Sequence, residues 1–581
     1  MRSGKYNSFL CNISDKLTSV WKSSFSSSVL CHDGGKKAKN SFIINFFNKL
    51  PVRKYIFNPI KNFISKSIDN SFFVRKLSTC FEYLLSFSLR CYGWCIVTFI
   101  AVSLIFNLLT KTFSENIALD SFVMILTLIP TLFVSKSVSK IICESGFFST
   151  LFIKLLNCDR LYLYSKNESR GSTSGAVIIG FVASFLTLAL PITDIFILLI
   201  LLVALAFFMC RPESAMLTLA LVFAFAPYEI NIYLSVIALI SYFVKVLRGK
   251  RSIYLNLYDT PPFLFLLLYL ILPTEKDATH VAVILTLLYF LFSALAKTEE
   301  FILKCIKNLF ISVSLYSAYN IVSFVVKYGF VSAVHLFEPE SAERANFPVS
   351  DSFSVFFVCA LVISLCLLSF DNCKKRAVLL GSVFNLLSLF ICGSGFSFVA
   401  LIVAGTIFYL CVLKNKVVIS AISVAVIAIS YKLFSNFSSS HLVVDTSSKL
   451  LEKYFSYILS GSLNSELIYK TEGVADAGNL WLQLAFWGGI LTVSCIFVSS
   501  IVFIRNGITT VYSDISLKTK YITSVISASM IAYVIASFGC FSWDEYSAFG
   551  FFWILGGLSS AARRYSHIQN DVINVEPDYK N

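Results

Sequence analysis

The sequence has little charge and little histidine. Asp, Glu, Lys and Arg together make up 14% of its 581 residues, and five residues are histidine. Soluble domains carry about 25% charged residues. With 57% apolar residues, 57 phenylalanines among them, this chain cannot bury its apolar surface inside one water-soluble core. The low charge therefore excludes the soluble classes and predicts an integral membrane protein whose solvent is lipid.

Motifs for metal-dependent and nucleotide-dependent chemistry are also lacking. The chain has no Cys-x-x-Cys or His-Glu-x-x-His pattern, and its histidines are scattered along the sequence. It has no glycine-rich loop of the kind that cradles the phosphates of ATP. Nearly all of its 16 cysteines fall in apolar or basic segments, so they do not indicate a disulfide framework. We therefore expect no metal, no cofactor and no hydrolysis of ATP.

Long apolar stretches are what the sequence has instead. Stretches of about 20 residues, the length that crosses a bilayer, recur from residue 91 to residue 562. They predict an all-α fold, a polytopic bundle of about 14–16 transmembrane helices. Segments 214–227 and 261–273 are short enough to be half-spans or re-entrant. The predicted spans are 92–110, 120–140, 174–191, 193–210, 214–227, 230–246, 261–273, 280–296, 303–326, 351–370, 376–392, 396–412, 416–433, 479–504, 518–539 and 548–562.

The net charge of +15 is concentrated ahead of the first span. Residues 1–90 hold 15 Lys and Arg against 4 Asp and Glu. Basic segments that flank spans stay in the cytosol, so we predict a cytosolic region over 1–90, a transmembrane domain over 91–562 and a cytosolic tail over 563–581. The basic residues of 1–90 alternate with aromatic and aliphatic ones, which favours contact with membrane lipids over nucleic-acid binding. The remaining dense basic clusters then fall on the same face as both termini: 245–251, 374–376, 414–416, 505 and 563–564.

The opposite face then carries two long loops, 327–350 and 434–478, both rich in ionisable residues. In the second loop, segment 447–460 places leucine, tyrosine, phenylalanine and isoleucine at helical spacing and is followed by Gly461. This pattern predicts an amphipathic helix over the outer end of the bundle. Simple interfacial packing and closure of a substrate cavity explain the pattern equally well.

Three segments, in this order along the chain, carry a resemblance to a known family: 343–348 (ERANFP), 392–397 (CGSGFS) and 477–490 (AGNLWLQLAFWGGI). The last has Asn479 followed ten residues later by Gly489 as the chain enters a span. It resembles the end of the large outer loop in the O-antigen ligase and O-antigen polymerase superfamily. The first segment is similar to that family's arginine-bearing segment, and the second to its Ser-Arg-Gly turn. The resemblance covers about residues 300–510.

Two departures from the family pattern favour the polymerase branch of the family over the ligase branch. Gly478 stands where the ligases carry histidine, and Gly395 stands where the turn carries arginine. The resemblance therefore implies a bacterial surface-polysaccharide polymerase, for O-antigen or exopolysaccharide, in the cytoplasmic (inner) membrane. Such a metal-independent glycosyltransferase would move a growing glycan from polyprenyl diphosphate to a lipid-linked acceptor at the outer face. Its partners would be the polyprenyl-diphosphate-linked oligosaccharide, membrane lipids, a flippase and a chain-length regulator.

This transfer needs cations for the departing diphosphate and a base for the attacking hydroxyl. Arg344 is the first candidate for binding the diphosphate, and Lys449 and Lys453 follow it. An ion pair with neighbouring glutamates is the alternative role of Arg344. Glu472 and Asp476 are the candidates for the catalytic base, and solvated loop charges are the alternative.

Polar and aromatic residues near the same segments are candidates for binding sugar. Asn479, Gln483 and Ser394 could hydrogen-bond the substrate, with helix-to-helix bonding as the alternative. Five aromatic residues could stack on sugar rings or could form an interfacial belt: Trp481, Trp487, Phe541, Trp543 and Tyr546.

Other functional classes stay open on the sequence alone. An O-antigen ligase, a secondary transporter, a lipid-linked glycan flippase and a receptor or scaffold without activity are all compatible with a polytopic bundle. The spans are nearly free of charge and show no clear internal repeat, whereas transporters carry ionisable groups near the bilayer midplane. This difference favours chemistry at the outer surface.

Overall fold

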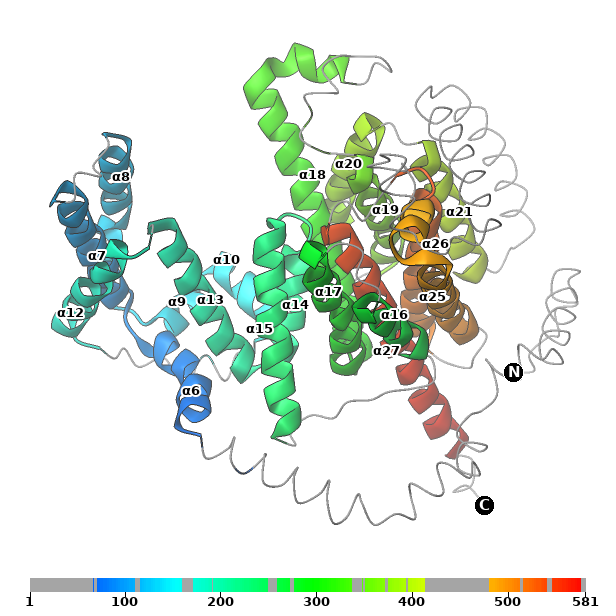
Figure 1. Cartoon of the computed structure of the whole chain (residues 1–581), viewed down its shortest axis with the longest axis horizontal. Helices are drawn as coiled ribbons and strands as arrows, with labels where there is room; N and C mark the ends of the chain where they lie inside the picture. The colour runs from blue at the N-terminus through cyan, green and yellow to red at the C-terminus, as the bar shows by residue number, and fades with distance from the viewer. Residues whose placement is uncertain are drawn as a thin grey trace, which may run out of the picture.

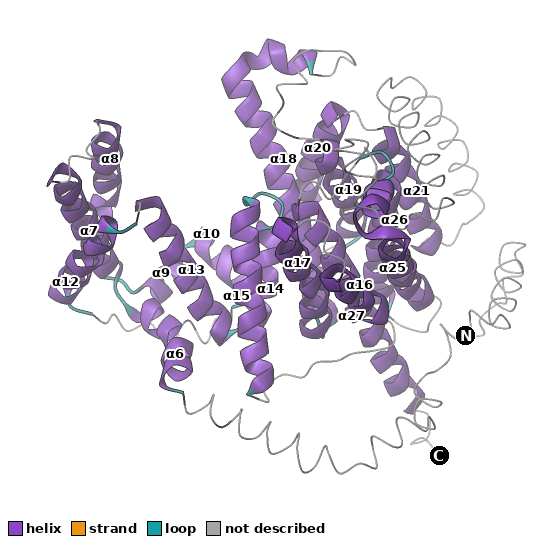
Figure 2. Ribbon diagram, in the orientation of Figure 1, coloured by secondary structure: helices purple, strands orange, loops and turns teal. Residues whose placement is uncertain are grey.

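The computed structural model describes residues 71–109, 115–158, 171–190, 192–248, 259–271, 276–336, 351–370, 375–392, 395–412, 480–511, 516–540 and 546–575, and singly Lys66, Leu163, Phe347 and Val349. The regular elements of these residues are helices (Figure 2), and one isolated β-bridge joins Ser88 to Ser137. The predicted all-α fold is confirmed.

The helices follow the chain as α6 Phe72–Ser86, α7 Leu89–Leu109, α8 Glu115–Leu132, α9 Val138–Glu144, α10 Gly146–Ser149, η2 Thr150–Leu155, α12 Thr173–Ser184, η3 Phe185–Leu188, α13 Ile192–Cys210, α14 Pro212–Val222, α15 Tyr228–Leu247, α16 Thr260–Ile271, α17 Lys276–Leu295, α18 Glu299–His335, η6 Asp351–Phe353, α19 Ser354–Leu368, α20 Lys375–Cys392, α21 Gly395–Val412, α25 Leu480–Val511, α26 Leu517–Ala536 and α27 Tyr546–Val575.

Seven of the described helices are long and apolar enough to cross a bilayer. They lie in α7, α15, α18, α20, α21, α25 and α26, and eight shorter apolar helices of 10–17 residues accompany them. The chain is therefore a multi-pass membrane protein. A helix coincides with each predicted span except 416–433, which lies outside the described residues together with loop 434–478 and its predicted helix.

Two boundaries of the predicted loops and tail differ in the structure. The loop predicted from residue 327 begins later, because α18 continues past a break at Gly329 to His335. The tail predicted from residue 563 begins as helix, because α27 runs on to Val575. Lys327 ends the apolar run of α18 just before the break at Gly329, and Arg563 and Arg564 end that of α27 while the helix continues.

The described helices form a main bundle and a smaller group beside it (Figure 1). The smaller group consists of α7, α8 and α12, which has its own core around Phe99 and Ile100. Gly180 allows α12 to approach α7 closely, since a Cβ at this position would lie 2.3 Å from the carbonyl oxygen of Cys95. Small residues serve the same purpose in other membrane helix pairs, where close packing replaces a hydrophobic driving force.

The centre of the main bundle is formed by α19 and α26. Helix α19 is apolar on all sides and almost wholly buried, and it packs against α18, α20, α21 and α26. Helix α26 instead carries many small polar residues, and Ser527 donates to the carbonyl oxygen of Ile504 on α25 at 3.0 Å. Gly507 makes this approach possible, because a Cβ there would overlap the Ser527 side chain.

Helix α14 is interrupted inside the bundle. It has 11 residues and ends at Val222, and Pro227 then prevents the helix from continuing into α15. Non-helical backbone is tolerated at membrane depth only where protein groups satisfy its hydrogen bonds. Here the side-chain amide of Asn231 donates to the carbonyl oxygens of Phe223 at 2.8 Å and Ala226 at 3.2 Å, and Ser312 Oγ accepts from the N–H of Ala224 at 3.0 Å. Segment 214–227, which the sequence left open as a half-span or a re-entrant segment, thus contains a short helix that ends at Val222.

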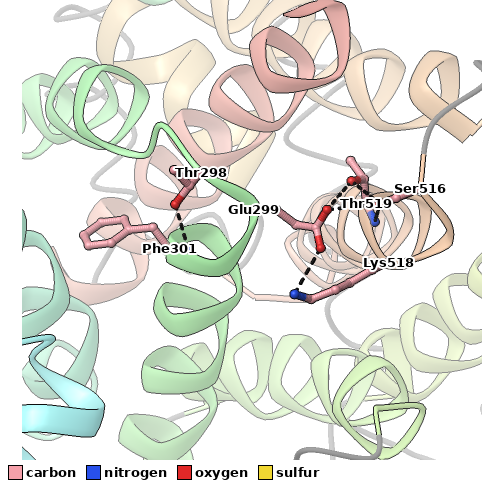
Figure 3. Close-up of polar contacts among 6 residues, drawn as sticks. All are labelled: Thr298, Glu299, Phe301, Ser516, Lys518 and Thr519. Atoms are coloured by element: carbon pink, nitrogen blue, oxygen red, sulfur yellow. Dashed lines mark hydrogen bonds and ion pairs between the residues drawn. The ribbon is translucent and has the colours of Figure 1, made fainter. Parts of the chain in front are cut away.

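A buried carboxylate joins α18 to α26 at the end of the bundle where both helices begin (Figure 3). Glu299 is 8% exposed and accepts hydrogen bonds from Ser516 Oγ at 3.1 Å and Thr519 Oγ1 at 2.5 Å. Lys518 Nζ lies 3.1 Å from its other oxygen. Ser516 also caps α26 by accepting from the N–H of Thr519. The carboxylate therefore holds two helix starts together at the positive end of the α26 dipole.

We expect Glu299→Ala to lower the free energy of unfolding by about 1–2 kcal/mol, because it removes three contacts while Lys518 remains half solvated. The measurement is the midpoint of thermal unfolding of the purified protein in detergent. Glu144→Ala is the matched control, since Glu144 pairs with Lys136 at 2.6 Å at an exposed site. An equal shift of the unfolding midpoint in both variants would contradict the role of Glu299 in joining α18 to α26.

Candidate functional site

The residues predicted for the site lie mostly outside the described part of the chain. This holds for Arg344, Ser394, Lys449, Lys453, Glu472, Asp476 and Asn479. Gln483 lies in the first turn of α25, but its side chain is also outside the description. The structure does describe the residues that follow three of these positions, Arg344, Ser394 and Asn479. Those residues outline the candidate site.

Phe347, three residues after Arg344, packs against the C-terminal half of α18. Phe347 is buried, and its ring lies 5.9 Å from that of Phe324 on α18. A few residues later the ring of Phe353 stacks on Tyr316 at 4.8 Å. The chain is thus fixed to α18 from Phe347 to the start of α19.

The helix that follows Ser394 begins beside the start of α19. Ser397, in the first turn of α21, donates a hydrogen bond to Ser354, the first residue of α19, at 2.8 Å. Both serines are fully buried. Phe396 packs on Gly539, which follows the end of α26 and would collide with that ring if it had a Cβ. The start of α21 therefore lies beside the start of α19 and the end of α26.

The helix that follows Asn479 begins at the same place. The N–H of Leu480 donates to the carbonyl oxygen of Ser537 at 3.1 Å. The ring of Trp481 lies 5.7 Å from Phe538 and 6.0 Å from Phe497. Trp481, in the first turn of α25, therefore packs against Phe497 of the same helix and against Phe538, which follows the end of α26; sugar stacking and an interfacial belt stay predictions for it.

These contacts form a continuous chain around one end of the bundle. They link the C-terminal half of α18, the starts of α19, α21 and α25, and the end of α26. The residues that make these contacts include Phe347, Ser354, Phe396 and Ser537. We call this set of helix ends the motif end. The three segments singled out in the sequence, although separated by up to about 130 residues, thus adjoin one end of the bundle.

The other end of the bundle carries paired basic residues. Arg563 donates to Asn506 Oδ1 at 2.6 Å, and Arg564 donates to both oxygens of Ser293. Lys518 contacts Glu299, as described above, and Lys245 donates to the carbonyl oxygen of Cys210 at 3.4 Å. These four basic side chains therefore fix the ends of helices to one another.

One polar group inside the bundle was missed by the sequence analysis. The hydroxyl of Tyr289 on α17 donates to the carboxylate of Asp259, just before α16, and lies 2.7 Å from Ser560 Oγ on α27. All three residues are buried. No motif could have revealed the group, because Tyr289 and Ser560 are 271 residues apart. Each polar atom in these bonds is paired, so the group ties α16, α17 and α27 together.

The described residues contain no group of three or more His, Cys, Asp or Glu side chains that could hold a metal ion. The cysteines within this part of the chain are free thiols. Comparison with protein families, with curated proteins and with solved structures gives no match to this chain.

Proposed function

We propose that this protein is a bacterial surface-polysaccharide polymerase of the cytoplasmic membrane. It transfers a growing glycan from polyprenyl diphosphate to a lipid-linked acceptor at the outer face. The observation that carries the proposal is the motif end, where the flanks of the three segments that resemble the O-antigen ligase and polymerase superfamily lie together.

Covalent connection strengthens this argument. Ser394 adjoins Gly395, and Asn479 adjoins Leu480, so each Cα lies within about 3.8 Å of a described one. Arg344 is three residues from Phe347, which limits its Cα to about 11 Å from that residue. Glu472 and Asp476 precede Asn479 on the same loop. A single reaction centre at the motif end is therefore within reach of these candidates.

The proposed reaction uses these residues in different roles. The guanidinium of Arg344 binds the departing diphosphate, and Lys449 and Lys453 add positive charge to it. Glu472 or Asp476 accepts the proton of the attacking sugar hydroxyl. Asn479, Gln483 and Ser394 orient sugar hydroxyls. Because Gly478 cannot act as the base that the ligases draw from histidine, the polymerase branch is favoured over the ligase.

A secondary transporter or glycan flippase is the second candidate, and the interrupted helix α14 favours it. Broken helices near the membrane midplane are typical of transporters. In this protein, however, Asn231 and Ser312 fill the interruption with hydrogen bonds. The interruption is thus packed as part of the bundle, which weighs toward the enzyme.

Deletion of the gene in its native bacterium tests the proposal. A polymerase mutant should lose long surface glycan chains on a gel and keep a single capped unit, because assembly of the unit does not need polymerisation. Accumulation of full-length lipid-linked polymer would identify a ligase instead. Lipid-linked single units trapped at the cytosolic face would identify a flippase, and an unchanged glycan profile would reject all three.

The proposed orientation places the motif end outside and both termini in the cytosol. Reporter fusions after Lys250 and Lys416 should therefore report the cytosol, and fusions near Glu340 and Glu466 should report the outside. The reason is the retention of Lys and Arg on the cytosolic side during insertion. Reversed signals at either pair of fusions would overturn this orientation.

A further inference from the structure

Helix α18 changes direction at Gly329. The backbone of this residue has φ 87° and ψ 167°, a conformation that only glycine adopts without strain. A Cβ at Gly329 would meet no atom within 4 Å. The glycine is thus required by the bend of the backbone and not by crowding. Figure 1 shows the last part of α18 turned away from the axis of the rest of the helix.

The bend lies where α18 should leave the hydrocarbon core. The stretch from Asn308 to Val326 contains no charged residue. At about 1.5 Å per residue its 19 residues span about 28 Å, close to the roughly 30 Å of a bilayer core. Lys307 precedes this stretch, and Lys327 follows it.

Side-chain exposure agrees with a position of the bend at the edge of the hydrocarbon core. Leu315, Tyr319, Val322 and Val326 lie on one face of α18, and each is more than half exposed. At the end of this apolar face, Lys327 Nζ lies 4.9 Å from the centre of the Tyr328 ring. Lysine and tyrosine are the residues that mark the boundary between lipid tails and headgroups.

The helical turns beyond the bend, Phe330–His335, form a short arm. Phe330 is 75% exposed, whereas Leu336 just after the arm is 2% exposed and belongs to the core. The arm therefore begins with an uncovered aromatic ring and ends against the protein. A free helix break is costly inside the hydrocarbon, where its backbone groups find no water. The bend and the arm fit the headgroup layer better than either the lipid tails or bulk water.

We infer that Phe330–His335 is an interfacial arm that lies along the surface of the membrane, with Phe330 inserted among the lipids at headgroup depth. The partner of this surface is the bilayer. The arm leads directly into the segment that holds Arg344. It would keep that arginine at the height of lipid-linked phosphates, a consequence that rests on the proposed function, whereas the placement of the arm does not.

Depth-dependent fluorescence quenching in nanodiscs tests the inference. A fluorescent amino acid is placed at Phe330 or, in a second variant of the full chain, at Val322, which lies seven residues, about 10 Å, before the bend at Gly329 and therefore deeper. Lipids brominated near the headgroup should quench the probe at 330 more than lipids brominated near the chain end. The order should be reversed for the probe at 322. Quenching of the 330 probe by aqueous iodide alone would overturn the inference.

A glycine substitution tests the role of the bend. Gly329→Ala should reduce quenching of the 330 probe by headgroup-brominated lipid, because alanine favours a straight helix that lifts the arm out of the surface. Gly405→Ala is the control, since Gly405 lies in helix α21 with its nearest contact at 3.8 Å. Unchanged quenching in a folded Gly329→Ala protein would show that the bend does not place the arm. If that variant fails to fold, the comparison of probes 330 and 322 still decides the depth.

Discussion

Arg344→Ala should abolish surface polymer while leaving the protein at its normal level in the membrane. In the proposed reaction the guanidinium supplies two charge-assisted hydrogen bonds to the departing diphosphate, at a site where water is partly excluded. Loss of such a group slows reactions by about 10²–10³-fold. The measurement is polymer length on a gel, normalised to the amount of protein in the membrane. Arg344→Lys keeps the charge but loses the planar fork, so it should restore only part of the activity.

A paired control separates binding from a structural role. If Arg344 only holds its loop by pairing with neighbouring carboxylates, the double variant Glu340→Gln, Glu343→Gln should be as damaging as Arg344→Ala. If Arg344 binds diphosphate, the double variant should keep most of its activity. Polymer of normal length in Arg344→Ala cells would remove this residue from the site.

Asn231→Leu should destabilise the bundle by about 2–4 kcal/mol, since it leaves two buried backbone carbonyls without donors. These are the carbonyls of Phe223 and Ala226 in the interruption between α14 and α15. Asn231 itself is 2% exposed. Leucine branches at Cγ as asparagine does but is larger, so overpacking adds to the loss and the control must carry the same change. The readout is the midpoint of thermal unfolding in detergent or nanodiscs.

Asn385→Leu is the matched control for this prediction. Asn385 is equally buried, and like Asn231 its Oδ1 has no partner among the described residues. Its amide, however, donates to the hydroxyl of Ser314 at 3.0 Å, and a serine hydroxyl can rotate to another acceptor. We expect a much smaller shift for this variant. Equal shifts in the two variants would show that the interruption does not depend on Asn231.

The candidate site could be predicted only in part. Order along the chain and resemblance singled out segments 343–348, 392–397 and 477–490, and the contacts of Phe347, Ser397 and Leu480 bring their flanks to one end of the bundle. Trp481 shows the limit of such reasoning. An aromatic residue beside a predicted loop suits a sugar, a lipid boundary or a helix contact equally well. Its neighbour Phe497 lies 16 residues later on α25, and its neighbour Phe538 follows α26.

The sequence by itself determined that the protein is a helical bundle in a membrane, and where most of its helices lie. The reason is local: a run of about 20 apolar residues must pair its backbone groups within its own helix once it is in lipid. The sequence also indicated that segment 214–227 is short for a full span, but the end of α14 at Val222 was seen only in the structure.

The tertiary structure decided how those helices support one another. Three groups of contacts join residues far apart in the chain: Tyr289 with Asp259 and Ser560, Glu299 with the start of α26, and Asn231 and Ser312 with the α14 interruption. Apolar periodicity does not encode these contacts, because lipid satisfies an apolar surface as well as another helix does. Small residues and single polar groups instead decide which helices pack together, and the partners of these residues are known only from the folded structure.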